Sequence, residues 1–386
     1  MPARQSPAKN ATRAGTAKSR QRPIRFALVG AGHIAQNAVL PGFTNARPGC
    51  ELTAIVSGDA RKRRALGKQY RVPHTLGYED FDAACRADLF DAVYIALPNS
   101  MHCEYTIRAA EAGIHVLCEK PMAVTSSECR RMINACREHD VRLMVAYRLH
   151  FNKANMEAVR IAGSGQIGDP RIFNSVFSMQ VKPENIRIQP GEGGGPLYDI
   201  GIYCINAARY LFRDEPIEIT ALNVLGEDDR FDDCDEASGA IMRFPGGRLA
   251  TFVCSFGAAD AGYYDLVGTR GSLCVDPAYE YQGKLKHFLT IGDRTREREF
   301  AKSDQFGPEL TYFSQCIRTG RDPEPGGREG LLDIRIIEAI DESARTGRSI
   351  TLERIGEEPK PDARQVMHYR PVRPRRKVHV AAPHRS

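Results

Sequence analysis

The feature that most constrains the fold is an apolar run that ends at a glycine-rich turn. Residues 24–30 read IRFALVG, which predicts a short buried strand. The pattern Gly-x-Gly-x-x-Ala begins at the last of these residues, with Gly30, Gly32 and Ala35 in its fixed positions. Residues 31–47 then predict a helix. A strand that turns through glycine into a helix is the start of a β-α-β unit.

The same alternation continues to about residue 148 and predicts a parallel, doubly wound α/β sheet. The further strands are expected at 51–57, 91–98, 115–121 and 142–147, and the further helices at 60–70, 103–113 and 126–138. The rhythm then changes, because strand-like segments follow one another with short glycine turns and few helices between them. This favours an α+β domain with a mainly antiparallel sheet. Its strands are expected at 171–180, 218–226, 237–245, 248–256, 263–269 and 271–277, and its helices at 152–163, 197–212, 308–319 and 329–346.

The charge of the chain is concentrated at its ends. The 386 residues carry a formal charge of +6, yet residues 1–23 and 364–386 contain 13 of the 54 basic residues and no acid. All 48 acids therefore lie between these ends with the other 41 basic residues, so the body is acidic and nucleic-acid binding by it is disfavoured. We divide the chain into a flexible basic arm (1–23), a Rossmann domain (24–148), a substrate and oligomerisation domain (149–358) and a flexible basic tail (359–386). The arms are either solvated or contact an anionic partner or a neighbouring subunit.

Composition also limits where the protein acts. No uncharged apolar run reaches the length of a membrane span, and the first residues lack the apolar region of a secretory signal. The 11 cysteines include no Cys-x-x-Cys pair and no zinc-ligand spacing, which is typical of buried thiols in a reducing compartment. We therefore expect a cytoplasmic protein without a metal.

The glycine turn predicts a dinucleotide site. The first glycine permits the tight turn, the second lets the backbone approach a pyrophosphate, and the helix that follows offers free N–H groups. An NAD site usually has a carboxylate at the end of the second strand, for the ribose 2′-hydroxyl. Here Ser57-Gly58 stands there, followed by basic residues at 61–64, which favours the 2′-phosphate of NADP. Asp59 is the alternative, since it would suit NAD if its side chain turned inward.

Three further stretches carry polar residues suited to chemistry. Residues 97–102 (LPNSMH) and 118–121 (CEKP) follow two neighbouring strands at the edge where such sheets bind ligands. In the third stretch, Asp199 and Tyr203 are four residues apart, so a helix would place both on one face. A phenol is a poor base at neutral pH, but a nearby lysine ammonium favours its ionised form. Lys120, Asp199 and Tyr203 together could move the proton of an alcohol. Alternatively, Glu119–Lys120 is a surface pair, Tyr203 a core aromatic and Asp199 a helix cap.

Five motifs in this order, GAGHIA, SGDARK, YIALPNSMH, CEKPMA and GGGPLYDIGIY, resemble the glucose–fructose oxidoreductase/inositol dehydrogenase/rhizopine catabolism (Gfo/Idh/MocA) family. The likeness covers roughly residues 24–352 and is greatest to the glucose–fructose oxidoreductase branch. It implies a Rossmann domain followed by a large open sheet that commonly forms a dimer or tetramer interface. It also implies a sugar, aldose or polyol substrate.

The resemblance further implies roles for individual residues. The cofactor would lie across Gly30, Ala31, Gly32, His33 and Ile34, with Ser57, Gly58 and Lys62 on the 2′-phosphate. Leu97, Asn99 and His102 would line the nicotinamide, and Glu119 would contact its ribose. Lys120 would touch both cofactor and substrate, Arg148 and Arg187 would border the site, Asp199 would orient the sugar, and Tyr203 would be the acid/base. We therefore expect an NADP-dependent sugar oxidoreductase. The alternative is a dinucleotide-sensing regulatory protein of the same fold without turnover.

Overall fold

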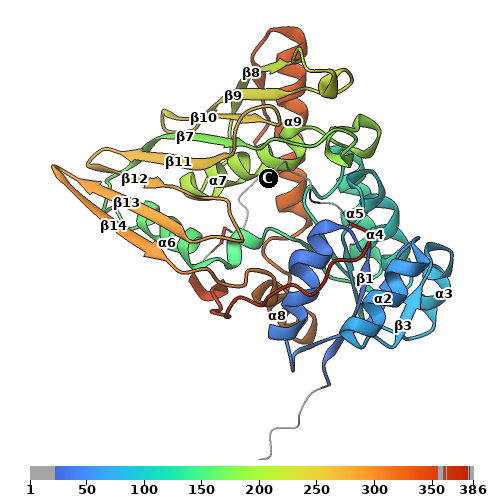
Figure 1. Ribbon diagram of the computed structural model, residues 1–386. Helices are drawn as coiled ribbons and strands as arrows, with labels where there is room; N and C mark the ends of the chain where they lie inside the picture. The colour runs from blue at the N-terminus through green and yellow to red at the C-terminus, as the bar shows by residue number, and fades with distance from the viewer. Residues whose placement is uncertain (1–21, 355–359, 362, 381, 383–386) are drawn as a thin grey trace, which may run out of the picture.

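Two sheets organise the chain (Figure 1). The structure is a computed structural model and describes residues 22–354, 360–361, 363–380 and 382. The first sheet has six parallel strands in the order β3-β2-β1-β4-β5-β6, which confirms the doubly wound Rossmann domain. Its strands are β1 (Ile24–Val29), β2 (Cys50–Val56), β3 (His74–Leu76), β4 (Ala92–Ile95), β5 (His115–Cys118) and β6 (Leu143–Val145).

Helices cover both faces of this sheet, and successive residues of β1 point to opposite faces. Phe26 and Leu28 pack in one apolar cluster with α1 and α2, while Ala27 and Val29 pack in another with α3, α4 and α5. The helices are α1 (Leu40–Asn45), α2 (Ala60–Tyr70), α3 (Phe81–Arg86), α4 (His102–Glu111) and α5 (Ser126–Glu138). Short helical turns add η2 (Tyr78–Asp80) and η3 (Asn99–Met101).

The helix expected at 31–47 differs from a regular helix. It begins as a π-helical turn, η1 (Ala35–Val39), and continues as α1. Pro41 lies in the first turn of α1 and has no backbone N–H to donate to the carbonyl four residues before it. The ordinary helical bonding is therefore interrupted at this point, just after the glycine turn.

The second sheet has nine strands in the order β14-β13-β12-β11-β7-β10-β9-β8-β15. Only β7 and β10 pair in parallel among these described strands, so the expected mainly antiparallel sheet is confirmed. The strands are β7 (Pro170–Ser178), β8 (Glu218–Val224), β9 (Ala237–Phe244), β10 (Arg248–Ser255), β11 (Ala261–Gly268), β12 (Gly271–Val275), β13 (Leu285–Ile291), β14 (Arg294–Phe300) and β15 (Ile350–Thr351).

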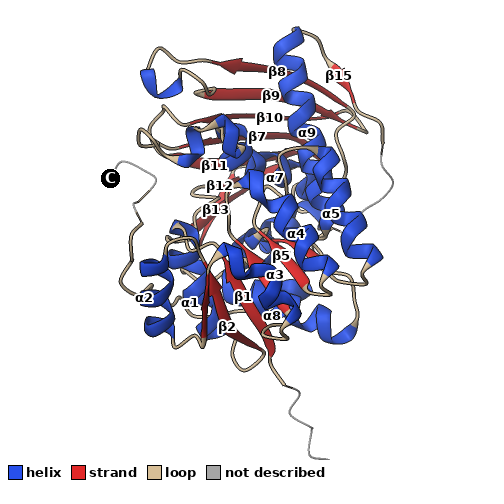
Figure 2. Cartoon of the chain, turned by 90° about the vertical axis from the view of Figure 1, so that its right-hand side faces the viewer, coloured by secondary structure: helices blue, strands red, loops and turns tan. Residues whose placement is uncertain are grey.

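One face of this sheet packs against helices and the other is open (Figures 1 and 2). The longer helices of this half are α6 (Lys153–Gly163), α7 (Ile202–Phe212), α8 (Phe306–Thr319) and α9 (Gly327–Thr346). The shorter ones are η4 (Arg148–Phe151), η5 (Ile186–Ile188), η6 (Pro190–Glu192), the π-helical η7 (Leu197–Gly201), η8 (Asp229–Phe231) and η9 (Ala363–Gln365). Among the described residues, no helix has both the length and the apolar character to cross a bilayer.

The chain returns twice from the second half to the Rossmann domain. First, α8 packs Phe306, Leu310 and Phe313 into the apolar cluster under β1, although its sequence position placed it in the second domain. Second, residues 363–380, which we call the C-terminal strap, lie along α1 and α2 (Figure 2). We expected a flexible tail here, because the segment has few large apolar residues. Its described part is instead held by polar contacts of its backbone. The expected N-terminal arm lies almost wholly outside the described residues.

A buried ionic network joins α7 to α9. The Arg209 guanidinium is fully buried and donates to Asp333 (2.5 Å), Glu329 (3.0 Å) and Glu215 (2.5 Å). Asn206, one turn earlier in α7, donates to the same two α9 carboxylates at 3.0 Å. Glu215 also pairs with Lys360, whereas Glu329 and Asp333 depend on Arg209 for their cation. Buried carboxylates are tolerated in a core only while their cation is present.

We expect Arg209→Met to lower the free energy of unfolding by about 3–5 kcal/mol, because it leaves buried carboxylates without their cation. Urea unfolding followed by far-UV circular dichroism measures the change. Arg137→Met, at an exposed position of α5, is the control and should alter stability by no more than about 0.5 kcal/mol. An unchanged urea midpoint in Arg209→Met would contradict this account of the network.

Candidate functional site

The glycine turn after β1 has the backbone that the motif requires. Gly30 has φ +95°, and a Cβ there would lie 2.3 Å from the Ala96 carbonyl oxygen, so only glycine fits. A Cβ on Gly32 would meet nothing within 4 Å, so this side of the turn is open. The turn is anchored to its neighbour strand by the Gly30 N–H, which donates to the Val56 carbonyl at 3.0 Å. A flat ligand can therefore approach the backbone here.

The end of β2 presents hydroxyl and basic groups. Ser57 is buried, and its carbonyl accepts from the Arg63 guanidinium at 2.9 Å. The Asp59 side chain begins α2 as its N-cap, where one oxygen accepts from the amides of Arg61 (2.9 Å) and Lys62 (2.8 Å). The Lys62 amide contributes most to lowering the pKa of Asp59, so the carboxylate is charged. The Asp59 side chain is therefore not turned inward, as an NAD site would require.

The two loops after β4 and β5 are tied together by His102. Its ring is fully buried, with Nδ1 2.8 Å from the Pro121 carbonyl and Nε2 3.0 Å from the Leu97 carbonyl. Burial lowers the pKa of His102. We expected this side chain to line the nicotinamide. Both ring nitrogens face backbone carbonyls, although a neutral ring donates to only one of them. His102 therefore joins the two loops and presents neither nitrogen to a ligand.

The neighbouring residues of these loops lie as follows. Leu97 is buried against the glycine turn, where its Cδ2 would meet a Cβ on Gly30. Asn99 donates to the Gly193 carbonyl at 2.7 Å, and Ser100 donates to Glu192 at 2.7 Å. These bonds join the loop after β4 to the segment that leads into η7. The Rossmann domain and the second domain therefore meet at this edge of the sheet.

Glu119 belongs to a buried acidic group that sequence reasoning did not find. The Tyr94 hydroxyl donates to Glu119 at 2.8 Å and lies 3.4 Å from Glu309 of α8. Burial raises the pKa of both carboxyls, and that of Glu309 well above its usual range. From the sequence alone, Tyr94 would be predicted to be an ordinary core residue of β4, and Glu309 an acidic residue on the surface of a helix. Neither pattern indicates that α8 folds back under the site.

Lys120 and Asp199 form the central ion pair of the site. The Lys120 ammonium donates to the Asp199 backbone carbonyl (2.7 Å) and to its carboxylate (3.1 Å). Arg187 donates to the other carboxylate oxygen at 2.6 Å. Burial alone would raise the pKa of Asp199, but the charges of Arg187 and Lys120 hold it well below its usual range. Burial likewise disfavours the Lys120 ammonium, but the charge of Asp199 offsets this, and the pKa of Lys120 is raised.

Two cations lie over the Tyr203 ring. Lys120 Nζ is 4.8 Å from the ring centroid and Arg148 Cζ is 5.0 Å from it. Arg148 is buried and fixed by bonds to Gln305 (2.6 Å) and to the Tyr279 carbonyl (2.6 Å). The Lys120 ammonium and the Tyr203 ring, which come from separate segments, therefore lie together, and their role in proton transfer stays a prediction. Gln305 and Tyr279, which hold Arg148, were not among the candidate residues.

The comparisons with known proteins agree with this geometry. An oxidoreductase family with an NAD-binding Rossmann fold matches residues 24–147, and the GFO/IDH/MocA C-terminal domain matches residues 156–274. The chain is 33% identical to the D-xylose 1-dehydrogenase (NADP+) of Haloarcula marismortui over 86% of this chain and 94% of that protein.

This chain belongs to the GFO/IDH/MocA oxidoreductase family.

Two solved structures extend the comparison. The aldose-aldose oxidoreductase of Caulobacter crescentus, complexed with glycerol, is 37% identical with a TM-score of 0.82. The match covers 86% of this chain and all of that one. A 3-ketoreductase of Actinomadura kijaniata, in complex with NADP and TDP-benzene, is 26% identical with a TM-score of 0.77, over 83% of this chain and 98% of that one. This GFO/IDH/MocA protein is therefore an enzyme with an NAD-binding Rossmann domain.

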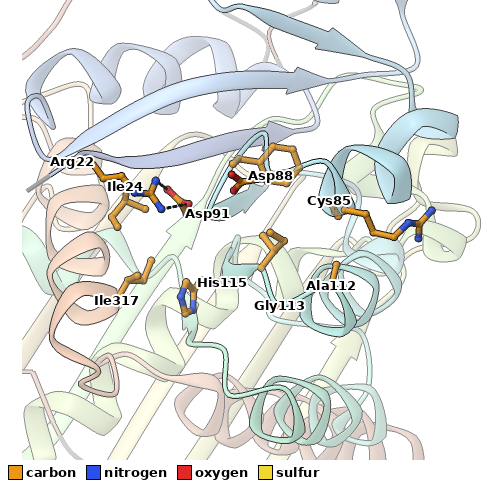
Figure 3. A pocket seen from close by; sticks show the side chains of 12 residues that line it. Arg22, Ile24, Cys85, Asp88, Asp91, Ala112, Gly113, His115 and Ile317 are labelled. Carbon is orange, nitrogen blue, oxygen red and sulfur yellow. Dashed lines mark hydrogen bonds and ion pairs between the residues drawn. The ribbon is translucent and has the colours of Figure 1, made fainter.

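A separate cavity of about 600 Å³ lies at the opposite edge of the parallel sheet (Figure 3). It is lined by residues at the amino ends of the strands, among them Ile24, Asp91 and His115. Parallel sheets of this kind bind their ligands at the carboxyl ends, so this cavity is not the dinucleotide site. Among the described residues, no group of three or more His, Cys, Asp or Glu side chains is placed to hold a metal ion.

We expect Asp199→Asn to lower the free energy of unfolding by about 3 kcal/mol at pH 7, since two partly buried cations lose their shared counter-ion. The folded-state pKa of Asp199 is depressed, so this stability is present above the unfolded pKa of about 3.9 and is lost as pH falls through the folded value. Urea unfolding of both proteins at pH 7, 5 and 3.5 should show a constant difference that shrinks only at the lowest pH. Exposed Asp169→Asn is the control, and a difference independent of pH would overturn the assignment.

Proposed function

We propose that this protein is an NADP-dependent oxidoreductase that transfers a hydride between nicotinamide and a carbon of a sugar, aldose or polyol. The observation that carries the proposal is the Lys120 ammonium. It is fixed by Asp199 and lies against the face of Tyr203, at the same edge of the parallel sheet as the glycine turn. A proton carrier and a charged lysine beside a dinucleotide-binding turn are the groups that oxidation of an alcohol needs.

The residues present fit NADP. The open side of Gly32 leaves the backbone of the turn accessible, and the helix after it offers N–H groups to a pyrophosphate. At the end of β2, Ser57, Gly58 and Lys62 would hold the 2′-phosphate, while Asp59 is engaged as a helix cap. The remaining contacts would come from the residues around the turn and the loops after β4 and β5, namely Ala31, His33, Ile34, Leu97, Asn99 and Glu119. The relatives from Haloarcula and Actinomadura, whose names or complexes include NADP, support this assignment.

The chain's own residues would handle the substrate oxygen and its proton. Bound nicotinamide supplies or accepts the hydride. Tyr203 would take the proton from the substrate hydroxyl, or return it to a carbonyl oxygen in the reverse direction. Lys120 keeps its charge and would stabilise negative charge on that oxygen, in a site with little water to screen it. Asp199 would fix the lysine and orient the sugar.

The two arginines would act at different distances from the substrate. Arg148 is buried behind Tyr203 and would hold the ring in place while adding positive charge to its face. Arg187 is about a quarter exposed and would border the sugar site, with its Nε donating to Asp199. Sugars are the substrates named for the relatives, and this supports the substrate class. The alternative of a non-catalytic sensor is disfavoured because Lys120, Asp199 and Tyr203 form one connected group.

A second copy of the chain would cover the open face of the second sheet. Several residues whose side chains point to this face are large, apolar and exposed, including Ile172, Leu249 and Val253. The strand register places Leu249 directly opposite Ile172, which in turn lies opposite Val267 of β11. Ile241 continues the same apolar face on β9. An exposed sheet face with several large apolar side chains marks an interaction surface, and we propose a homodimer or homotetramer through it.

We expect Lys120→Met and Tyr203→Phe each to lower the turnover number about 10²- to 10⁴-fold, because each removes a group that handles the substrate proton. Absorbance at 340 nm with NADP and a panel of aldoses and polyols measures turnover. NADPH binding, measured by calorimetry, should persist in both variants. Lys153→Met and Tyr263→Phe, which lie away from the site, are the matched controls. Cofactor binding without turnover of any substrate by the unaltered protein would favour the sensor.

We expect Val253→Glu to reduce the mass of the native particle to that of one chain, because a buried unpaired charge would lie at the centre of the interface. Sedimentation equilibrium or native mass spectrometry gives the mass. Ala363→Glu, at an exposed position of η9, should leave the assembly intact. If the unaltered protein already sediments as a single chain, the open face is not an interface between copies.

A further inference from the structure

The C-terminal strap lies along the outside of the Rossmann domain and ends at its dinucleotide edge (Figure 2). The backbone of Tyr369 pairs with that of Asp304 in an isolated antiparallel β-bridge. The Asn45 side chain of α1 donates to the backbone carbonyl of the following residue, Arg370, at 2.8 Å. Further on, the Arg375 guanidinium lies 4.9 Å from the centroid of the Tyr70 ring at the end of α2. The strap thus runs from the far ends of α1 and α2 toward their amino ends.

Gln36 is the anchor of the strap at the glycine turn. Its side chain is almost completely buried, and its amide nitrogen donates both to the Ala31 carbonyl (2.9 Å) and to the Val378 carbonyl (3.0 Å). The Val378 N–H donates back to the Gln36 oxygen at 2.8 Å. Val378 also packs against the apolar cluster under β1. One buried side chain therefore connects the strap directly to the turn that would hold the pyrophosphate.

The next residue of the strap takes the second oxygen of Asp59. His379 Nδ1 lies 3.1 Å from Asp59 Oδ2, and since a carboxylate can only accept, Nδ1 carries the proton. The other oxygen, Oδ1, already accepts from the amides of Arg61 and Lys62. Asp59 is the acidic residue nearest to the end of β2, where an NAD site uses a carboxylate for the ribose 2′-hydroxyl. Both of its oxygens are engaged within the protein.

We propose that the C-terminal strap sets the coenzyme preference of this enzyme through the contact between His379 and Asp59. With His379 in place, the Asp59 oxygen that does not cap α2 is already hydrogen-bonded, so a ribose 2′-hydroxyl would have to compete with His379 for it. The His379 N–H also lies against the carboxylate that would otherwise face a 2′-phosphate directly. The strap therefore disfavours NAD and favours NADP. The proposal rests on the dinucleotide site proposed above.

The charges around Asp59 act in the same direction. The first turns of α2 carry Arg61, Lys62 and Arg63, and these cations suit a 2′-phosphate better than a hydroxyl. The strap has six basic residues and no acid between 364 and 380. Its Arg375 and Arg376 lie at the opposite end of α2, against Tyr70 and Gln69. His379 is a positioning residue in this scheme, because it acts through Asp59.

The test is the ratio of the dissociation constants for NADP and NAD, measured by calorimetry on the full chain and on His379→Ala. Removal of His379 frees Asp59 to accept a 2′-hydroxyl and to repel a 2′-phosphate. We expect weaker NADP binding, tighter NAD binding and a shift of the ratio toward NAD of about fivefold, the size typical of a partly exposed pair. His368→Ala, at an exposed position of the same strap, is the matched control and should not change the ratio.

A second background separates a specific effect from general damage to the strap. Asp59→Asn keeps a good N-cap but removes the negative charge. If His379 acts through that charge, the double variant Asp59→Asn/His379→Ala should have the same ratio of dissociation constants as Asp59→Asn alone. An unchanged ratio in His379→Ala, or the same shift with and without Asp59, would overturn the proposal. If the unaltered protein binds neither NADP nor NAD, the proposed function fails instead.

Discussion

The site depends on one ion pair that joins the two halves of the chain. Lys120 follows a strand of the parallel sheet, and Asp199 lies in the π-helical turn that leads into α7 of the second domain. The pair holds a charged lysine at the boundary between the domains, and Arg187 adds a second cation on the same carboxylate. If the two halves moved apart, the lysine and the carboxylate would each be left as an unpaired charge with little solvent around it. The same ion pair therefore fixes both the relative position of the two halves and the charge state of the site.

The parts predictable from sequence are those whose signal is local. The glycine turn at Gly30 follows from a backbone that only glycine adopts, and the alternation of strands and helices follows from apolar periodicity. The spacing of Asp199 and Tyr203 predicted a shared helix face. The structure brings both to Lys120, although a π-helical turn replaces the first part of the expected helix. Here the family motif carried information that periodicity alone did not.

The parts that escaped prediction depend on contacts distant in sequence. β14 reads RTREREF, which has no apolar face, and it is a strand because it pairs with β13 at the edge of the sheet. Glu309 looks like a surface acid, yet α8 folds back and buries it under the site. The C-terminal strap has too little apolar surface to predict its packing. It is held by backbone groups that pair with polar side chains, such as Gln36, whose burial depends on the whole fold.

The buried acidic group around Tyr94 completes the electrostatics of the site. Two carboxyls next to one phenol in a dry environment disfavour each other's charge, and burial raises the pKa of both, that of Glu309 well above its usual range. The charge of the adjacent Lys120 opposes this rise at Glu119, whereas the main neighbouring charge at Glu309 is Glu119 itself, which raises the pKa of Glu309 further. Both carboxyls are thus held in the neutral form more readily than an exposed carboxyl is, and the effect is larger at Glu309. The carboxylate that pairs with the Lys120 ammonium is that of Asp199. This pairing keeps the lysine protonated, and that is the state in which it can stabilise charge on a substrate oxygen.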